Sequence, residues 1–164
     1  MRLHTRLAAS ALILGATLSH PDLARADLTG FVAAATTPQT RPGFGFAAGG
    51  SFAVIGWEAE YCYNTEDPGD MAPAVRTYMG NVFAQNPVPI NGLTFYATVG
   101  GGIYSERLGE GESETNVGTN LGGGVKIDLT GPLRLRLDYR VFTFVGSPLY
   151  KSPQRFYVGL VLNF

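Results

Sequence analysis

Large apolar residues alternate with small or polar residues over much of this chain, most clearly at its C-terminal end. In RFYVGLVLNF (155–164), every second position is large and apolar: Phe156, Val158, Leu160, Leu162 and Phe164. A period of two is the spacing of a β-strand whose two faces meet different surroundings. The segment therefore predicts a strand with one apolar face, and either protein or lipid has to cover that face.

The same alternation recurs in seven earlier segments, with turn-forming residues between them. In LRLRLDYRVF (133–142), apolar residues alternate with charged ones, and Thr130-Gly131-Pro132 marks a tight turn before it. The other segments lie near 28–35, 43–52, 56–64, 77–85, 93–106 and 116–129. Because no segment after residue 26 shows a sustained helical period, the pattern predicts an all-β chain of eight antiparallel strands.

The connections between these segments alternate between long and short. An even number of strands places both ends of the domain on one side, and all the long connections on the other. The long connections are expected near 36–42, 65–76, 107–114 and 147–154. The first short turn falls either at 53–55 or at Gly49-Gly50-Ser51, and the others fall near 86–92 and 130–132.

The first 26 residues differ from the rest. Arg2 and Arg6 precede an apolar run, AASALILGATL (8–18), and Ala24-Arg25-Ala26 fits a cleavage site. We interpret residues 1–26 as a cleaved signal peptide and residues 27–164 as one domain; an uncleaved anchor is the alternative. Cleavage would remove three arginines and one aspartate, so the formal net charge would move from −1 to −3. That charge gives no basis for a nucleic-acid partner.

Eight alternating strands fit two kinds of barrel. A soluble barrel of the lipocalin type buries its apolar face inside, whereas a membrane barrel turns that face to lipid. Ten residues of a tilted strand span roughly 26 Å, close to the apolar band of an outer-membrane barrel. Aromatic residues also lie toward the strand ends, as at membrane interfaces. They are Trp57, Tyr63, Tyr78, Phe156 and Phe164.

Glycines and balanced charges gather on the polar face and favour the membrane barrel. The interior of an eight-stranded barrel is just wide enough for side chains, so long polar side chains there need small neighbours. The glycines are Gly100, Gly102, Gly118, Gly122, Gly124 and Gly159. Buried charges also have to be paired. Four acidic and four basic residues form the predicted lumen charge network: Glu58, Glu60, Lys126, Asp128, Arg134, Arg136, Asp138 and Arg140.

With these features, the chain resembles small outer-membrane β-barrel proteins of the OmpA/OmpX type. The resemblance rests on the export signal and on WEAEY (57–61), GTNLGGGVKIDL (118–129), GPLRLRLDYRVF (131–142) and RFYVGLVLNF. It implies an eight-stranded up-and-down transmembrane barrel in a Gram-negative outer membrane, with periplasmic termini and surface loops. It also implies that the five apolar residues of the last segment form a C-terminal assembly signal. The implied partners are outer-membrane lipid, lipopolysaccharide and the barrel-assembly machinery; we expect a monomer.

Few residues suggest catalysis. Both histidines precede residue 27, so Ser-His-Asp and Cys-His arrangements would lack their base. Cys62, the single cysteine, is expected to be a free thiol in a strand. Glu58 and Glu60 have the chemistry for acid–base work, but pairing with interior arginines is the favoured interpretation. We therefore expect no enzyme, no cofactor and no resident metal.

Two long connections are acidic: NTEDPGDMAP (64–73) and ERLGEGESET (106–115). Such loops have the ligands for a divalent cation or for ions that bridge to lipopolysaccharide, although solvated acidic loops are the simpler interpretation. The expected role is envelope integrity, adhesion or ligand binding through the surface loops. The alternatives are a narrow channel for small solutes and a soluble exported ligand-binding barrel.

Overall fold

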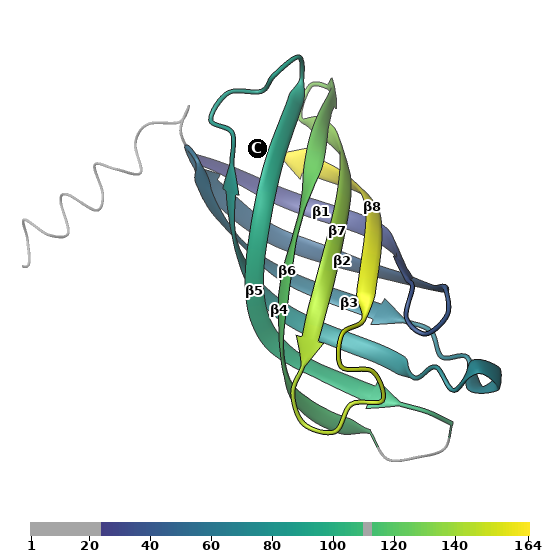
Figure 1. Ribbon diagram of the computed structural model, residues 1–164. Coiled ribbons are helices and arrows are strands. Elements are labelled where there is room, and N and C mark those ends of the chain that lie inside the picture. The colour runs from purple at the N-terminus through teal and green to yellow at the C-terminus, as the bar shows by residue number, and fades with distance from the viewer. Residues whose placement is uncertain (1–23, 110–112) are drawn as a thin grey trace, which may run out of the picture.

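The computed structural model describes residues 24–109 and 113–164, and these form a closed antiparallel barrel (Figure 1). The eight strands are β1 (Ala24–Ala35), β2 (Arg41–Phe52), β3 (Ile55–Asn64), β4 (Ala74–Gln85), β5 (Leu93–Arg107), β6 (Glu114–Thr130), β7 (Leu133–Phe144) and β8 (Gln154–Asn163). Each strand pairs with its sequence neighbours, and β1 pairs with β8 to close the barrel. The predicted eight-stranded up-and-down topology is confirmed.

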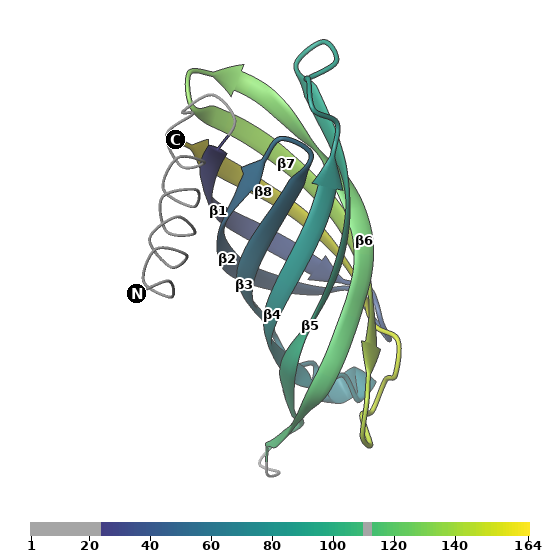
Figure 2. The ribbon, with the colours of Figure 1, turned by 90° about the vertical axis from the view of Figure 1, so that its left-hand side faces the viewer.

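The two ends of the barrel differ. Figures 1 and 2 show the C-terminus beside the start of β1 at one end, which we call the turn end. The opposite end, the loop end, carries the connections 36–40, 65–73 and 145–153, and β5 ends and β6 begins there. The first turn is Ala53-Val54, and Gly49 to Ser51 lie within β2, which decides between the two predicted positions.

Regular helix is almost absent from the described residues. The loop 65–73 contains one 3₁₀ turn, η1 (Pro68–Asp70), in which the Asp67 carboxylate accepts a hydrogen bond from the Gly69 amide at 3.1 Å. No helix in the described part of the chain is long and apolar enough to span a membrane.

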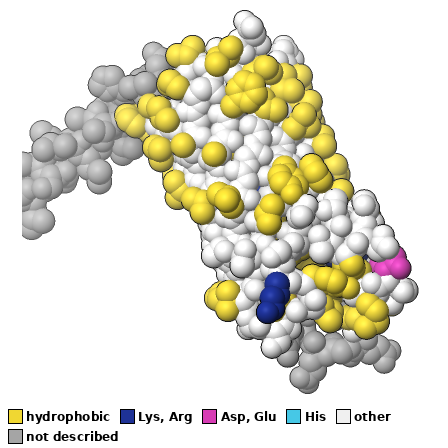
Figure 3. All heavy atoms as spheres, viewed as in Figure 1, with side chains coloured by type: hydrophobic (Ala, Val, Ile, Leu, Met, Phe, Trp, Pro, Cys, Tyr) yellow, Lys and Arg dark blue, Asp and Glu magenta, His cyan; other side chains and the backbone are white. Residues whose placement is uncertain are grey.

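The apolar face of the strands points outward, away from the barrel axis. Leu160 is 51 % exposed, whereas Arg136 is 5 % exposed. On the face that Figure 3 shows, hydrophobic side chains spread over the barrel wall, and charged ones appear only near the loop end. The polar face therefore lines the lumen, as predicted. This orientation does not match a soluble barrel with an apolar interior.

Glycines on the polar face make room for long side chains in the lumen. A Cβ atom on Gly124 would lie 2.7 Å from the Tyr96 hydroxyl, and one on Gly122 would lie 2.8 Å from Cγ of Arg140. Both contacts are shorter than van der Waals distance, so these two positions have to stay small for Tyr96 and Arg140 to lie where they do. This is the packing role that the sequence predicted for the interior glycines.

The lumen is not polar throughout, which the sequence analysis did not predict. One apolar cluster consists of Phe31, Ala33, Ala47, Cys62 and Tyr157. A second consists of Val75, Met79, Tyr104, Phe142 and Phe144. The second cluster lies toward the loop end, because Phe142 and Phe144 occupy the last inward positions of β7. Aromatic packing thus fills part of the space that we expected charged side chains to fill.

Candidate functional site: the packed lumen

Strand β7 contributes the largest share of the charged side chains of the lumen site. Its inward positions read Arg136, Asp138 and Arg140, because alternate residues of a strand share one face. Opposite them, β3 turns Glu58 and Glu60 inward by the same alternation. All five side chains are buried, and we call them the central cluster.

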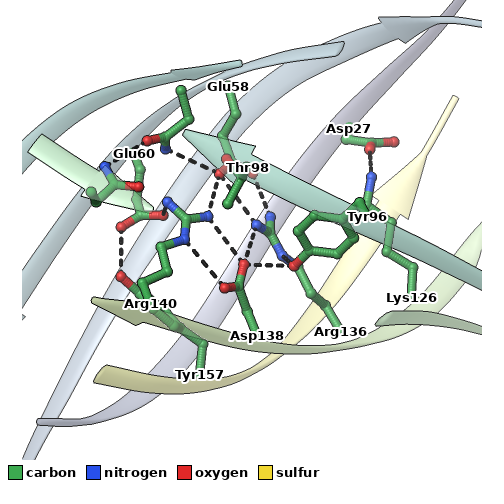
Figure 4. A network of polar contacts seen from close by, with 12 residues as sticks. Asp27, Glu58, Glu60, Tyr96, Thr98, Lys126, Arg136, Asp138, Arg140 and Tyr157 are labelled. Atoms are coloured by element: carbon green, nitrogen blue, oxygen red, sulfur yellow. Dashed lines mark hydrogen bonds and ion pairs between the residues drawn. The ribbon is translucent and has the colours of Figure 1, made fainter. Parts of the chain in front are cut away.

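Arg136 joins three elements of the barrel (Figure 4). Its guanidinium forms ion pairs with Glu58 and, at 2.7 Å, with Asp138. Its Nε donates a hydrogen bond of 2.7 Å to the hydroxyl of Tyr96 from β5. That hydroxyl donates in turn to Asp138 Oδ2 at 2.5 Å. The arginine is therefore surrounded by acceptors, as a buried cation requires.

Arg140 is fully buried and contacts all three carboxylates of the central cluster. Its Nη2 lies 2.9 Å from Glu58 Oε1 and 3.1 Å from Asp138 Oδ2, and its Nη1 lies 3.0 Å from Glu60 Oε2. The hydroxyl of Tyr157, from β8, donates to Glu60 Oε1 at 3.0 Å. The cluster thus ties β3, β5, β7 and β8 together across the lumen.

A third arginine, Arg155 of β8, lies beside the central cluster. Its Nη1 donates to the hydroxyls of Thr77 at 3.1 Å and Tyr157 at 3.2 Å. Its guanidinium carbon lies 4.5 Å from the centroid of the Phe142 ring, a cation–π contact. With Arg155 included, three arginines face three carboxylates, so the middle of the lumen is neutral overall.

The remaining residues of the predicted network lie apart from the central cluster. Lys126 pairs with Asp27 of β1, a partner that the sequence analysis missed. Arg134 pairs with Asp128 at 2.7 Å near the turn end, where the Asp128 side chain is 40 % exposed. The eight predicted residues therefore do not form a single network: five form the central cluster, Arg134 and Asp128 form a separate pair, and Lys126 pairs with Asp27, which was not among the eight.

Sequence reasoning also missed Tyr96, Arg155 and Tyr157. Each lies on the polar face of its strand, so period two alone would have placed it in the lumen. The predicted network contained only formally charged residues, all from three segments, and no tyrosine hydroxyl. It also left out Arg155, which begins the apolar C-terminal segment.

The geometry of the site favours a structural role for its carboxylates. Glu58 and Glu60 are both held by arginine, so neither is an uncommitted acid or base. Cys62 is a buried free thiol. Among the described residues, no group of three or more potential ligand side chains is placed to hold a metal ion. A cavity of about 60 Å³ at the turn end, lined in part by Ser51, Thr94 and Arg134, holds little more than water.

The five residues predicted as a C-terminal assembly signal lie on the outer wall. Phe156, Val158, Leu160 and Leu162 are exposed positions of β8, and Phe164 follows them at the turn end. Phe164 exchanges backbone hydrogen bonds with Ala26 of β1, at 2.8 and 2.9 Å. Their role in assembly stays a prediction.

Comparison with known proteins gives a fold rather than a family. No protein-family model and no curated protein matches the chain. Among solved structures, the N-terminal β-barrel domain of Pseudomonas aeruginosa OprF matches with a TM-score of 0.64 and 14 % identity, covering 85 % of this chain and 97 % of that one. The chain has the fold of small outer-membrane β-barrels.

Two further structures show how widely this fold is used. Ail, the attachment invasion locus protein of Yersinia pestis, matches with a TM-score of 0.57 and 12 % identity, covering 87 % of this chain and 99 % of Ail. The outer membrane enzyme PagL matches with a TM-score of 0.50 and 12 % identity, covering 84 % and 98 %. Because one of these proteins is an enzyme, the fold alone does not decide between catalysis and a structural role.

Proposed function

We propose that this protein is an integral outer-membrane barrel with a plugged lumen, whose long loops carry its interactions at the cell surface. The observation that carries the proposal is the central cluster, five charged side chains buried across a barrel whose outer wall is apolar.

The outer wall supports membrane insertion. Exposed residues such as Phe46, Val99, Leu121 and Leu160 come from strands all around the barrel. A soluble monomer rarely exposes a continuous apolar patch larger than a few hundred Å². Lipid would cover this wall, and each strand's backbone groups are already bonded within the closed barrel.

The lumen supports a plugged barrel rather than a channel. A solute on its way through would have to separate Arg140 from its three carboxylates. Breaking a buried ion pair leaves a charge unpaired, which costs about 3–5 kcal/mol. Farther toward the loop end, the ring stack of Tyr104 on Phe144, with centroids 3.8 Å apart, lies across the same path.

The loops are joined to one another, which supports a shared interaction surface. Arg41 donates to the carbonyl oxygens of Thr37, at 2.9 Å, and Thr65, at 3.3 Å, and so links the first two loops. The Glu66 carboxylate accepts from the Gly109 amide at 3.2 Å, linking the second loop to the third. Ail, which has a similar fold and is named for attachment, gives a precedent for interactions of this kind.

Fractionation and conductance test the proposal. We expect the protein in the outer-membrane fraction of the cells that make it. In planar bilayers, the purified chain should give no steady single-channel steps under conditions where a reconstituted porin conducts. Steady steps would instead support the narrow channel, and recovery in the soluble fraction without detergent would contradict membrane insertion.

A further inference from the structure

Two arginines on the outer wall at the loop end have no carboxylate partner among the described residues. Arg76 of β4 pairs in register with Ser105, and Arg107 of β5 pairs with Ala74, so the two arginines are diagonal neighbours. Both are exposed. Arg76 faces outward because its neighbours Val75 and Thr77 point into the lumen, and Arg107 faces outward because it lies three positions from the inward Tyr104.

Around these arginines the wall is hollowed. A cavity of about 110 Å³ is lined by Arg76 and Arg107 together with Tyr63, Ser105 and Ser113. The Arg76 guanidinium carbon lies 5.5 Å from the centroid of the Tyr63 ring. Two guanidinium groups, a phenol and two hydroxyls surround a space of small-anion size. We call this the cationic pocket.

An apolar groove of about 530 Å³ lies on the same wall, closer to the turn end. Its floor is Ala48, Ala59 and Gly80, which lie opposite one another on β2, β3 and β4. Its sides include Tyr61 and Tyr78, whose ring centroids are 5.0 Å apart. The groove exists because these floor residues are small. The two tyrosine rings border it on the side of the cationic pocket.

The groove continues toward the turn end. A second hollow of about 880 Å³ is lined in part by Gly50, Phe52, Trp57 and Val82. Along β4, the outward positions Arg76 and Val82 lie six residues apart, which in a tilted strand is roughly 16 Å across the membrane, more than half of an apolar band of about 25 Å. The wall over β2–β4 thus has a cationic end and a long apolar hollow below it.

We propose that this face binds one outer-leaflet lipid of the lipopolysaccharide type, with a phosphate in the cationic pocket and an acyl chain in the groove. Guanidinium groups match phosphate in charge and in the geometry of their donors. A second copy of this chain is a poorer occupant, because it would bring together two pairs of arginines that have no carboxylate partner in the described ranges. The inference rests on the proposed function, which places the loop end in the outer leaflet.

The test compares two lipids on the folded full chain in detergent. The probes are diphosphoryl lipid A and the same lipid with both phosphates removed, with bound lipid counted by native mass spectrometry. We expect wild-type protein to bind the diphosphoryl form at least tenfold more tightly. Equal affinity for the two lipids would overturn the proposal, and this comparison needs no variant.

Substitutions then locate the site. R76A/R107A should lose at least tenfold in affinity for diphosphoryl lipid A and should bind the phosphate-free lipid as wild type does. Lys151→Ala, which removes an exposed cation of the loop 145–153, is the control and should leave both affinities unchanged. Wild-type affinity of R76A/R107A for the diphosphoryl lipid would overturn the assignment of the pocket.

A third arm separates a lipid from a free anion. Gly80→Leu fills the groove without a backbone clash, because a Cβ there meets nothing closer than 3.8 Å. It should weaken binding of diphosphoryl lipid A severalfold with both arginines present. If inorganic phosphate displaced the lipid at equal concentration, the site would be one for free phosphate and the lipid proposal would fail.

Failure of the inference is distinguishable from failure of the proposed function. Wild-type protein that reaches the outer membrane but does not discriminate between the two lipids would contradict only the lipid site. Protein that does not reach the outer membrane would contradict the proposed function itself.

Discussion

At the scale of single residues, the buried charges determine how strongly a substitution in the lumen destabilises the folded barrel. Arg136 lies between Glu58 and Asp138, and the Tyr96 hydroxyl completes its surroundings. Removing it leaves two carboxylates with fewer donors in a place that water does not reach freely. Arg134 makes a similar pair with Asp128, but nearer to solvent. The two arginines therefore form a natural comparison on one strand.

Arg136→Leu should destabilise the folded barrel by about 3–5 kcal/mol, because it breaks a buried ion pair. Arg134→Leu, the control, should cost about 0–1 kcal/mol, as a partly exposed pair does. The measurement is urea unfolding in detergent micelles, followed by the gel shift between heated and unheated samples. If both variants lowered the free energy of unfolding equally, burial would not determine how much these ion pairs contribute to stability.

The sequence placed the charged side chains on the correct face but did not give their partners. Alternation fixes the direction in which Lys126 points, yet its partner Asp27 is 99 residues away and lies just before the predicted segment 28–35. Pairing across a lumen depends on the register of all eight strands and on side-chain rotamers, and neither is a local property. Phe142 and Phe144 were missed as lumen residues because the predicted segment ended at Phe142, whereas the strand continues to Phe144.

At the scale of elements, the strands were the most predictable feature. Period two located all eight. At the loop end, β4 begins at Ala74 and β7 continues to Phe144, each beyond its predicted bound; at the turn end, β1 begins at Ala24, four residues before the predicted segment 28–35. Loop-end boundaries are harder because pairing there continues past the apolar pattern. The hairpin of β5 and β6 shows this, with strands of 15 and 17 residues that end in polar sequence.

Neighbouring glycines of β5 test the two faces directly. Gly102→Ala should destabilise the barrel by about 1–3 kcal/mol, because its Cβ would lie 1.9 Å from the Tyr78 carbonyl oxygen and the backbone would have to move. Gly101→Ala, one residue away, meets nothing closer than 3.7 Å and should be neutral or stabilise by about 0.4–1 kcal/mol. The same urea titration compares the stability of the two variants. If Gly101→Ala were the more destabilised of the two, the assignment of inward and outward positions on β5 would be wrong.

At the scale of the whole molecule, alternation together with length predicted a closed barrel with its apolar face outward. The cell-surface role was not predictable to the same degree, because it depends on loops without periodic sequence. Figure 1 shows these loops gathered at one end, away from the C-terminus. The rigid barrel and its orientation follow from many repeated small signals, whereas a binding loop is specified by a few residues that no pattern repeats.

Trp57 reports on the orientation of the whole molecule in a bilayer. It is the only tryptophan in the chain, is 62 % exposed, and lies on the outer wall near the turn end. In liposomes whose acyl chains carry bromine, we expect strong quenching of its emission and little quenching by aqueous acrylamide. Tryptophan favours this interfacial depth because its ring is apolar and its N–H is polar.

The matched control moves the fluorophore off the wall. Val88, in the connection 86–92 at the turn end, is 70 % exposed and lies outside the strands. W57F/V88W should reverse the result, with efficient quenching by acrylamide and weak quenching by brominated lipid. If wild-type emission responded to acrylamide as strongly as that of the double variant, lipid would not cover the outer wall. The apolar surface would then need another partner, and the membrane placement of the loop end would lose its basis.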